Sequence, residues 1–311
     1  RWTATLAENH RITTGFEYTT EDRVDTADKS IPHNVHNFGA FLQDEVQLAE
    51  PFGLVVGARY DEHSDFGSAF SPKVGAWLKL NEHLRLRGSY GEGFRAPTVW
   101  ELYIGSPFTN NKKIIANPEL DAEKSRSYEI GADGKWGTFI CGITAFRNDM
   151  RDMISEVPVV NKPKTYDLKN ISRAMTRGIE ITTGIRLPYG FTLSDEVTFL
   201  DTEDLSTGNE LLFVPDAANT VKLACKGGKG FSGNIRVVTT GRQWTEESNT
   251  RIRTDPYTLV NCYLGKKVNS NAELFVGVDN IFNVDANAAY GNSGGAGSTG
   301  TYFYGGIMCT L

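Results

Sequence analysis

Histidine most often supplies the general base of a hydrolytic site, and all five histidines fall within the first 83 residues. They are His10, His33, His36, His63 and His83. A Ser-His-Asp or Cys-His site would therefore need a base from this part of the chain. There is no H-E-x-x-H motif and no P-loop, and Gly91-Glu92-Gly93 lacks the third glycine of a dinucleotide fingerprint. We predict that the protein is not an enzyme. A hydrolase is the alternative that a nucleophile beside one of these histidines would support.

Metal ligands and reactive thiols are equally sparse. The four cysteines are Cys141, Cys225, Cys262 and Cys309, and no two have C-x-x-C spacing. Each is in phase with apolar neighbours, which predicts small apolar residues and leaves long-range disulfides as the alternative. The carboxylates of segment 201–204 could bind calcium, although a solvated loop start explains them as well. We predict no metal site and no cofactor.

The composition argues against a nucleic-acid-binding protein. The sequence also lacks an apolar run long enough for a membrane-spanning helix. The net charge is −6 and the pI is near 5.5, whereas nucleic-acid binders carry a basic surface. Mean hydropathy is −0.33, and no apolar run approaches the roughly 20 residues of a spanning helix. A transmembrane β-strand, however, needs only about 9–11 residues, of which every second one can be polar.

Apolar and polar residues alternate in segments that recur along the whole chain, as expected for β-strands with two different faces. Leu54 and Val56 share one face of such a segment while Arg59 lies on the other, and Leu274 and Val276 show the same pattern. The fifteen predicted strands span 1–8, 10–21, 36–48, 52–63, 68–80, 83–93, 123–136, 138–153, 170–187, 190–203, 213–226, 231–245, 255–268, 270–281 and 301–311.

Short and long connections alternate between these strands. Seven are tight, such as Asn81-Glu82 and Trp136-Gly137, and the seven between them are mostly long and polar. This asymmetry predicts an antiparallel up-and-down meander, typical of a bacterial outer-membrane barrel. Lipid cannot satisfy backbone N–H and C=O groups, so such a sheet closes on itself, with an apolar outer face and a polar lumen. An odd strand number indicates that we have miscounted by one or that strands precede residue 1.

One set of side chains should then face lipid and the other water. The basic residues expected in the wet interior are Arg59, Lys73, Arg85 and Arg87. The aromatic residues expected at the membrane interfaces are Tyr60, Tyr90 and Trp136. Asp195 does not fit this alternation, because it is in phase with Leu193 and Val197.

Several motifs follow one another in a fixed order. They are Phe94-Arg95-Ala96-Pro97 with Glu101-Leu102-Tyr103, Asn117-Pro118-Glu119-Leu120, Ser127-Tyr128-Glu129-Ile130-Gly131, Gly178-Ile179-Glu180, Asn280-Ile281-Phe282 and Tyr290-Gly291. The set resembles TonB-dependent outer-membrane receptors, over about residues 90–311 and less closely over 1–90. The resemblance implies an all-β transmembrane barrel of 22 strands, of which about 15 are in this chain. Residues 1–311 would be the C-terminal portion of the barrel of a longer protein. The plug domain, the TonB-contacting segment and about seven strands would then lie outside it.

The resemblance also implies a function. Such a receptor binds a scarce metal chelate at its outer loops and imports it with energy from the TonB complex. A ferric siderophore is the expected cargo and cobalamin the second choice. Haem is disfavoured, because segment 98–116 lacks the histidine that haem-uptake members carry there. The expected partners are the cargo, the TonB complex and outer-membrane lipid. The alternative is a passive porin or another structural barrel of the bacterial outer membrane.

Aromatic and arginine side chains on the outer loops and upper lumen wall are the predicted ligand-binding residues. They are Arg95, Tyr103, Phe108, Tyr166, Trp244 and Tyr290. A structural role is the alternative for Arg95, which could pair with Glu92 or Glu101 and brace the barrel wall against the plug. No catalytic residue is predicted.

Overall fold

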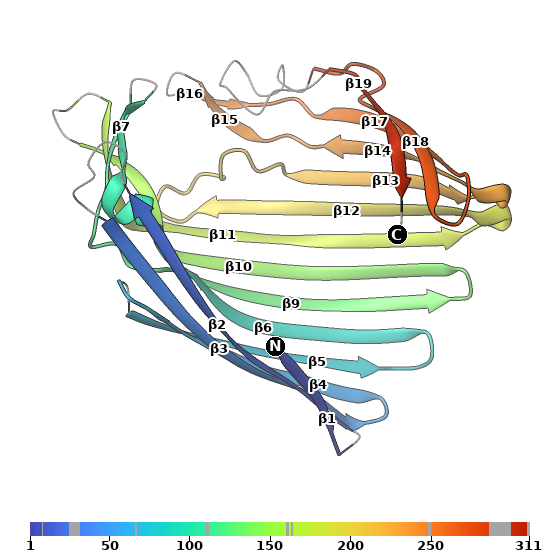
Figure 1. Cartoon of the computed structure of the whole chain (residues 1–311), viewed down its shortest axis with the longest axis horizontal. Coiled ribbons are helices and arrows are strands. Elements are labelled where there is room, and N and C mark those ends of the chain that lie inside the picture. Colours follow the sequence, from blue (N-terminus) through green and yellow to red (C-terminus); the bar gives the residue numbers. More distant parts are fainter. Residues whose placement is uncertain are drawn as a thin grey trace.

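The computed structural model describes residues 1–7, 9–24, 32–65, 67–109, 112–159, 162, 164–247, 250–285 and 300–309. Most of them lie in antiparallel strands that form one strongly curved sheet (Figure 1). Within these ranges the sheet has seventeen strands, two of which are the short β7 (Ser106–Thr109) and β8 (Lys112–Ile115). The other fifteen form the up-and-down wall that the sequence predicts.

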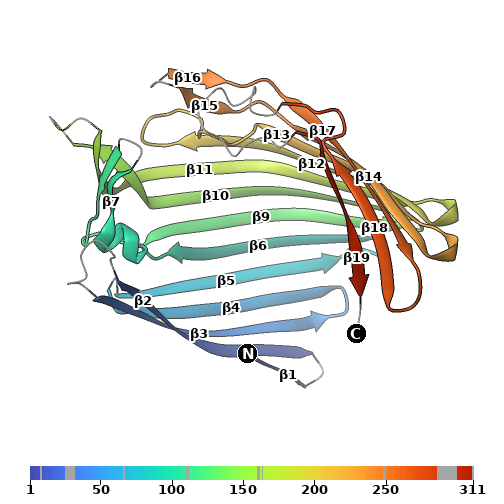
Figure 2. The same cartoon turned by 45° about the horizontal axis from the view of Figure 1, so that its top comes forward.

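The fifteen strands follow one another around the sheet in chain order. The first eight are β1 (Trp2–Leu6), β2 (His10–Val24), β3 (Pro32–Ala49), β4 (Phe52–His63), β5 (Gly67–Lys79), β6 (Leu84–Arg95), β9 (Glu123–Trp136) and β10 (Phe139–Pro158). The other seven are β11 (Thr165–Arg186), β12 (Phe191–Asp204), β13 (Ala217–Lys226), β14 (Phe231–Thr240), β17 (Tyr257–Lys267), β18 (Ala272–Asp279) and β19 (Tyr302–Cys309). Among the described residues β1 pairs only with β2, and β19 only with β18, so these two strands are the edges of the sheet (Figure 2).

Short turns lie at one end of the strands, on the right in Figure 1, and we call it the short-turn end. Two of them have only two residues, between β3 and β4 and between β9 and β10, and in the second Gly137 has a φ of +57° that favours glycine. The short-turn end also carries two single-turn 3₁₀ helices, η2 (Pro188–Gly190) and η3 (Gly228–Gly230). The opposite end, the long-loop end, carries the long connections.

Strand boundaries agree with the sequence prediction best where the strands cross the apolar zone. β4 and β9 have the predicted limits. The predicted connection 154–169 was too long, because β10 continues to Pro158 and β11 begins at Thr165. Those ends continue the hydrogen-bonded ladder, and Leu168 of β11 is buried there. The opposite error occurs at predicted strands 213–226 and 231–245, because β13 begins at Ala217 and β14 ends at Thr240.

The outer face of the sheet is apolar, and we call it the lipid-facing surface. One row of residues that lie opposite each other across six strands consists of Leu78, Leu86, Ala132, Ile143, Ile181 and Val197. Large apolar side chains on this face are open to the surroundings, with Val56 53% and Val276 59% exposed. A contiguous apolar surface of this extent suits a lipid environment and not water.

The other face carries the charged residues that the alternation predicts for a wet lumen. Arg59 pairs with Asp61 at 2.7 Å, and Arg85 pairs with Asp133 at 2.8 Å. Arg87 lies 3.5 Å from the same Asp133 carboxylate. The two pairs with Asp133 cross from β6 to β9 on the lumen side, so they stabilise the register of these strands.

Two features of the lipid-facing surface answer questions that the sequence raised. Asp195 does lie on the apolar face, where the side-chain amide of Asn219 donates a hydrogen bond to its carboxylate at 2.5 Å. All four cysteines are free thiols and are in phase with apolar residues of this surface, as Cys262 is with Ile235 and Val278 opposite it. The small-apolar interpretation of the cysteines is therefore confirmed.

The long-loop end contains elements that the sequence did not predict. They are the π-helical turn η1 (Trp100–Ile104), the β7–β8 hairpin and the separate hairpin of β15 (Trp244–Glu247) and β16 (Thr250–Arg253). The buried apolar cluster of the described residues also lies there, formed by Leu102, Leu120 and Leu168. None of the described helices is long and apolar enough to cross a membrane.

Candidate functional site

An ion pair joins the two strand ends that flank the connection 96–122. Arg95 is the last residue of β6 and lies opposite Glu123, the first residue of β9. The Arg95 guanidinium donates two hydrogen bonds to the Glu123 carboxylate, at 2.6 and 2.8 Å. It also donates to Glu101 at 3.0 Å. The arginine therefore fastens both ends of the loop and its first helical turn at one point.

The turn η1 begins with a reciprocal cap. The backbone N–H of Thr98 donates to the Glu101 carboxylate at 2.7 Å, and the backbone N–H of Glu101 donates to the Thr98 hydroxyl at 3.2 Å. This T-x-x-E arrangement satisfies two donors at the start of a helix. Burial alone would raise the pKa of Glu101. The hydrogen bonds from Arg95 and Thr98 outweigh that effect and lower the pKa below its ordinary value.

The second motif of the loop packs against the first. Leu120 follows Asn117-Pro118 and joins Leu102 of η1 and Leu168 of β11 in the buried cluster. The side-chain amide of Asn117 donates to the carbonyl of Leu168 at 2.8 Å, and its backbone N–H donates to the carbonyl of Glu101 at 2.9 Å. The two motifs thus fold together over the first residues of β11, and we call this folded unit the cap.

Two more predicted ligand-binding residues belong to this cap. The hydroxyl of Tyr103 donates to the Asp65 carboxylate at 2.9 Å. Burial, and then this hydrogen bond, raise the pKa of Tyr103. Tyr166 of β11 lies opposite Ile114 of β8 in a short parallel pairing. The structure therefore brings Arg95, Tyr103 and Tyr166 together around the same cluster and gives each a structural contact.

Trp244 lies in a different group of the long-loop end, on the β15–β16 hairpin. The guanidinium carbons of Arg251 and Arg253 lie 5.3 and 5.9 Å from the centre of its indole ring. Arg253 pairs with Asp216 at 3.1 Å, and Arg251 donates to the carbonyl of Glu210 at 2.6 Å. Sequence reasoning missed both arginines. Their spacing on one short strand was the available signal, since alternate residues of a strand share a face.

The remaining predicted sites do not form a catalytic or metal centre among the described residues. The side chain of Phe108 and the whole of Tyr290 lie outside the described part of the chain. In segment 201–204, Asp201 pairs with Arg177 at 2.7 Å, and Asp204 accepts hydrogen bonds from Ser206 and Thr207. The described residues contain no cluster of three or more potential metal ligands. The ring nitrogens of His10 and His83 contact the Asp44 carboxylate and the Lys135 carbonyl, and neither partner is the hydroxyl or thiol of a Ser-His or Cys-His site.

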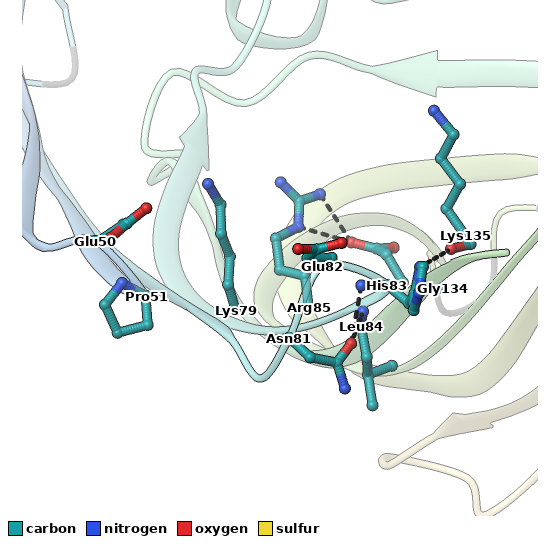
Figure 3. A pocket seen from close by; sticks show the side chains of 11 residues that line it. Glu50, Pro51, Lys79, Asn81, Glu82, His83, Leu84, Arg85, Gly134 and Lys135 are labelled. Atoms are coloured by element: carbon teal, nitrogen blue, oxygen red, sulfur yellow. Dashed lines mark hydrogen bonds and ion pairs between the residues drawn. The ribbon is translucent and has the colours of Figure 1, made fainter. Parts of the chain in front are cut away.

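A pocket of about 580 Å³ occupies the short-turn end (Figure 3). Arg85 and Asp133 pair inside it, and the Asn81 side chain accepts hydrogen bonds from the backbone N–H groups of His83 and Leu84 at 2.8 and 3.0 Å. None of the six predicted ligand-binding residues lines this pocket. The hydrogen bonds to Asn81 close the turn between β5 and β6, and the Arg85–Asp133 pair joins β6 to β9.

An apolar outer face, a charged inner face and long loops gathered at one end define a membrane β-barrel. Residues 1–281 match the family described as TonB dependent receptor-like, beta-barrel. The chain belongs to the TonB-dependent receptors of the bacterial outer membrane.

Relatives and solved structures agree with this assignment. The ferric enterobactin receptor PirA of Pseudomonas aeruginosa is 25% identical over 268 residues, 78% of this chain and 36% of that protein. An iron-regulated outer membrane virulence protein of Vibrio cholerae is 27% identical over 307 residues, 91% of this chain and 47% of that protein. A crystal structure of a mutant ferric enterobactin receptor from Pseudomonas aeruginosa, in complex with enterobactin, matches with a TM-score of 0.80 and 21% identity. It covers 99% of this chain and 52% of that chain. The chain thus spans about half or less of these proteins.

Proposed function

We propose that this chain forms most of the wall of a receptor that captures a ferric siderophore at its long-loop end and imports it. The observation that carries the proposal is the group formed by Trp244, Arg251 and Arg253. Ferric complexes of oxygen-donor siderophores are anionic, and many have aromatic arms. Guanidinium groups attract the charge, and an indole face packs against an aromatic ring.

The relatives support the same class of cargo, because they include ferric enterobactin receptors and an iron-regulated outer membrane protein. Cobalamin is the second candidate. We further propose that import depends on the TonB complex, acting through a plug domain that the family resemblance predicts outside this sequence. Growth on the ferric siderophore as sole iron source should then require both the receptor and TonB.

Cargo-dependent quenching of tryptophan fluorescence in the complete receptor tests the binding step. Ferric enterobactin, haem and cobalamin are titrated in turn, and we expect quenching by the ferric siderophore. Replacing Trp244 by Phe should remove most of that signal, because the indole ring would lie against the cargo. The matched control is Trp136→Phe, because Trp136 lies on the lipid-facing surface at the opposite end.

The two arginines provide the second test. The double variant Arg251→Gln/Arg253→Gln should weaken siderophore binding about tenfold or more, the effect expected for losing a charge-assisted contact. The control is Lys124→Gln/Arg151→Gln, which removes two cations from the lipid-facing side. If no cargo quenches the fluorescence and small solutes pass freely through the barrel, the protein is a passive porin and this proposal is wrong.

A further inference from the structure

Strands β5 and β6 pair along only part of their length. Their ladder stops at Lys73 and Gly91, whereas β5 continues to pair with β4 and β6 with β9 toward the long-loop end. The two strands separate in both views (Figures 1 and 2). A pocket of about 470 Å³ lies in this opening, between residues 68–70 of β5 and 92–94 of β6.

The opening marks the level of the lipid head groups. Backbone N–H and C=O groups beyond the end of a ladder need water or head groups around them, because hydrocarbon cannot satisfy them. Just below the opening, the rings of Tyr90 and Tyr128 lie 5.1 Å apart on the lipid-facing surface. Aromatic side chains of this kind occur at the boundary between hydrocarbon and head groups.

Two cations without an ion pair among the described residues lie two same-face positions beyond this aromatic pair, toward the long-loop end. Lys124 of β9 and Arg151 of β10 are directly opposite each other, line the pocket and are exposed. Lys124 alternates in phase with Tyr128, which places both cations on the lipid-facing surface. In the described part of the chain no carboxylate forms an ion pair with either. Like charges opposite each other destabilise a ladder, and an anion between them would remove that repulsion.

None of the three acidic residues that line the pocket forms an ion pair with Lys124 or Arg151. Glu92 pairs with Arg126 at 3.2 Å and accepts a hydrogen bond from the hydroxyl of Tyr90. Asp121 precedes β9, and Asp152 follows Arg151 in a bulge where its φ is +56°. The row between the aromatic rings and the two cations is balanced, because Arg126 pairs with Glu92. Of the three cations that line the pocket, Lys124 and Arg151 are therefore the two without an ion pair among the described residues.

We propose that Lys124 and Arg151 bind the phosphate of a lipid in the outer leaflet, whose acyl chains continue down the apolar surface. Lysine and arginine are strong ligands for phosphate, and exposed Phe70 offers apolar contact at the mouth of the same pocket. The occupant is a lipid and not a free ion, because the cations open onto the surface that acyl chains cover. The inference depends on the membrane location of the wall and not on the identity of the cargo.

Native mass spectrometry of the complete, delipidated receptor in detergent tests this. The probes are dioleoyl phosphatidic acid, dioleoylglycerol, which has the same chains without phosphate, and inorganic phosphate. We expect phosphatidic acid to bind at least about tenfold more tightly than dioleoylglycerol, and Lys124→Gln/Arg151→Gln to lose that difference. Arg151→Lys should retain it.

The matched control is Lys222→Gln/Arg236→Gln. These residues are also a lysine and an arginine directly opposite each other, but they lie on the lumen side. The control should leave lipid binding unchanged, and siderophore quenching should be unchanged in Lys124→Gln/Arg151→Gln. Equal loss in both double variants, no loss in either, or competition by inorganic phosphate at the lipid's own concentration would overturn the proposal.

Discussion

The two ends of β6 are stabilised in different ways. At the short-turn end, Arg85 pairs with Asp133 across one ladder, and the Arg85 side chain is 52% exposed. At the long-loop end, Arg95 pairs with two carboxylates, Glu101 and Glu123, whose side chains are only 14% and 10% exposed. The first arrangement is a surface ion pair. The second holds a 27-residue connection, 96–122, that packs its own apolar residues.

The difference shows what each kind of connection requires. A two-residue turn such as the one after β9 follows from strand register and one glycine, so no tertiary contact has to hold it. A long connection has no register of its own. It becomes ordered when leucines leave water and their neighbouring polar groups find partners, as Leu102 and Asn117 do here. The two ends should therefore respond differently to substitution.

The largest expected effect is on the buried cluster. Leu102→Ala leaves a cavity between η1 and β11 and should lower the local stability of the cap by about 2–5 kcal/mol. Hydrogen exchange of residues 98–105 in the purified receptor would report the change. Leu86→Ala, on the half-exposed lipid-facing surface, is the control and should leave this exchange unaltered. Equal effects of the two substitutions would mean that the cluster does not hold the loop.

Removing the bridging arginine comes next. Arg95→Ala leaves the Glu101 and Glu123 carboxylates without their cation and should cost about 1–3 kcal/mol, reduced because the arginine is half exposed. Protease cleavage within 96–122 should accelerate, while the strands stay resistant. Arg95→Lys restores the charge but not the two-pronged geometry, and should lie between the wild type and the alanine variant. Unchanged cleavage in Arg95→Ala would assign the loop's order to the leucines alone.

A pH series gives a smaller effect at the same place. The pKa of Glu101 is lower in the folded loop than its ordinary value. Its contribution is therefore complete above the ordinary glutamate pKa of about 4.3 and is lost as the pH falls through the lower, folded value. The protection factors of residues 98–105, which correct for the intrinsic pH dependence of amide exchange, should stay constant from pH 8 to about pH 5 and fall below about pH 4. Glu101→Gln should remove this loss of protection, and its persistence would implicate another carboxylate.

The smallest effect is expected at the opposite end. Arg85→Ala should change stability by about 0–1 kcal/mol, the usual value for an exposed ion pair, and less in high salt. Urea unfolding of the receptor in detergent provides the measurement. A loss as large as that of Arg95→Ala would contradict the contrast between the two ends.

Sequence reasoning found the wall because the wall is governed by a period of two. The limits of β4 and β9, the lumen position of Arg59 and the lipid-facing cysteines all follow from that alternation. The salt bridge of Arg95 with Glu101 was one of the two stated alternatives, and the other partner, Glu92, binds Arg126 instead.

The long-loop end could not be predicted to the same extent. The contacts of Asn117 with Leu168 and of Tyr103 with Asp65 join segments that no local pattern relates. Besides the spacing of Arg251 and Arg253, a second readable signal was missed. Thr98 and Glu101 have the spacing of a reciprocal helix cap, which indicates a helical turn directly after Pro97.

The orientation of the four cysteines has a consequence for their reactivity. The cell envelope is an oxidising compartment, in which unpaired thiols usually become cross-linked. Attack requires the thiolate, and acyl chains around a side chain exclude both the water that would solvate that anion and the water-borne oxidants that would consume it. By turning its sulfur atoms toward the bilayer, this wall can keep unpaired cysteines where most exported proteins form disulfides.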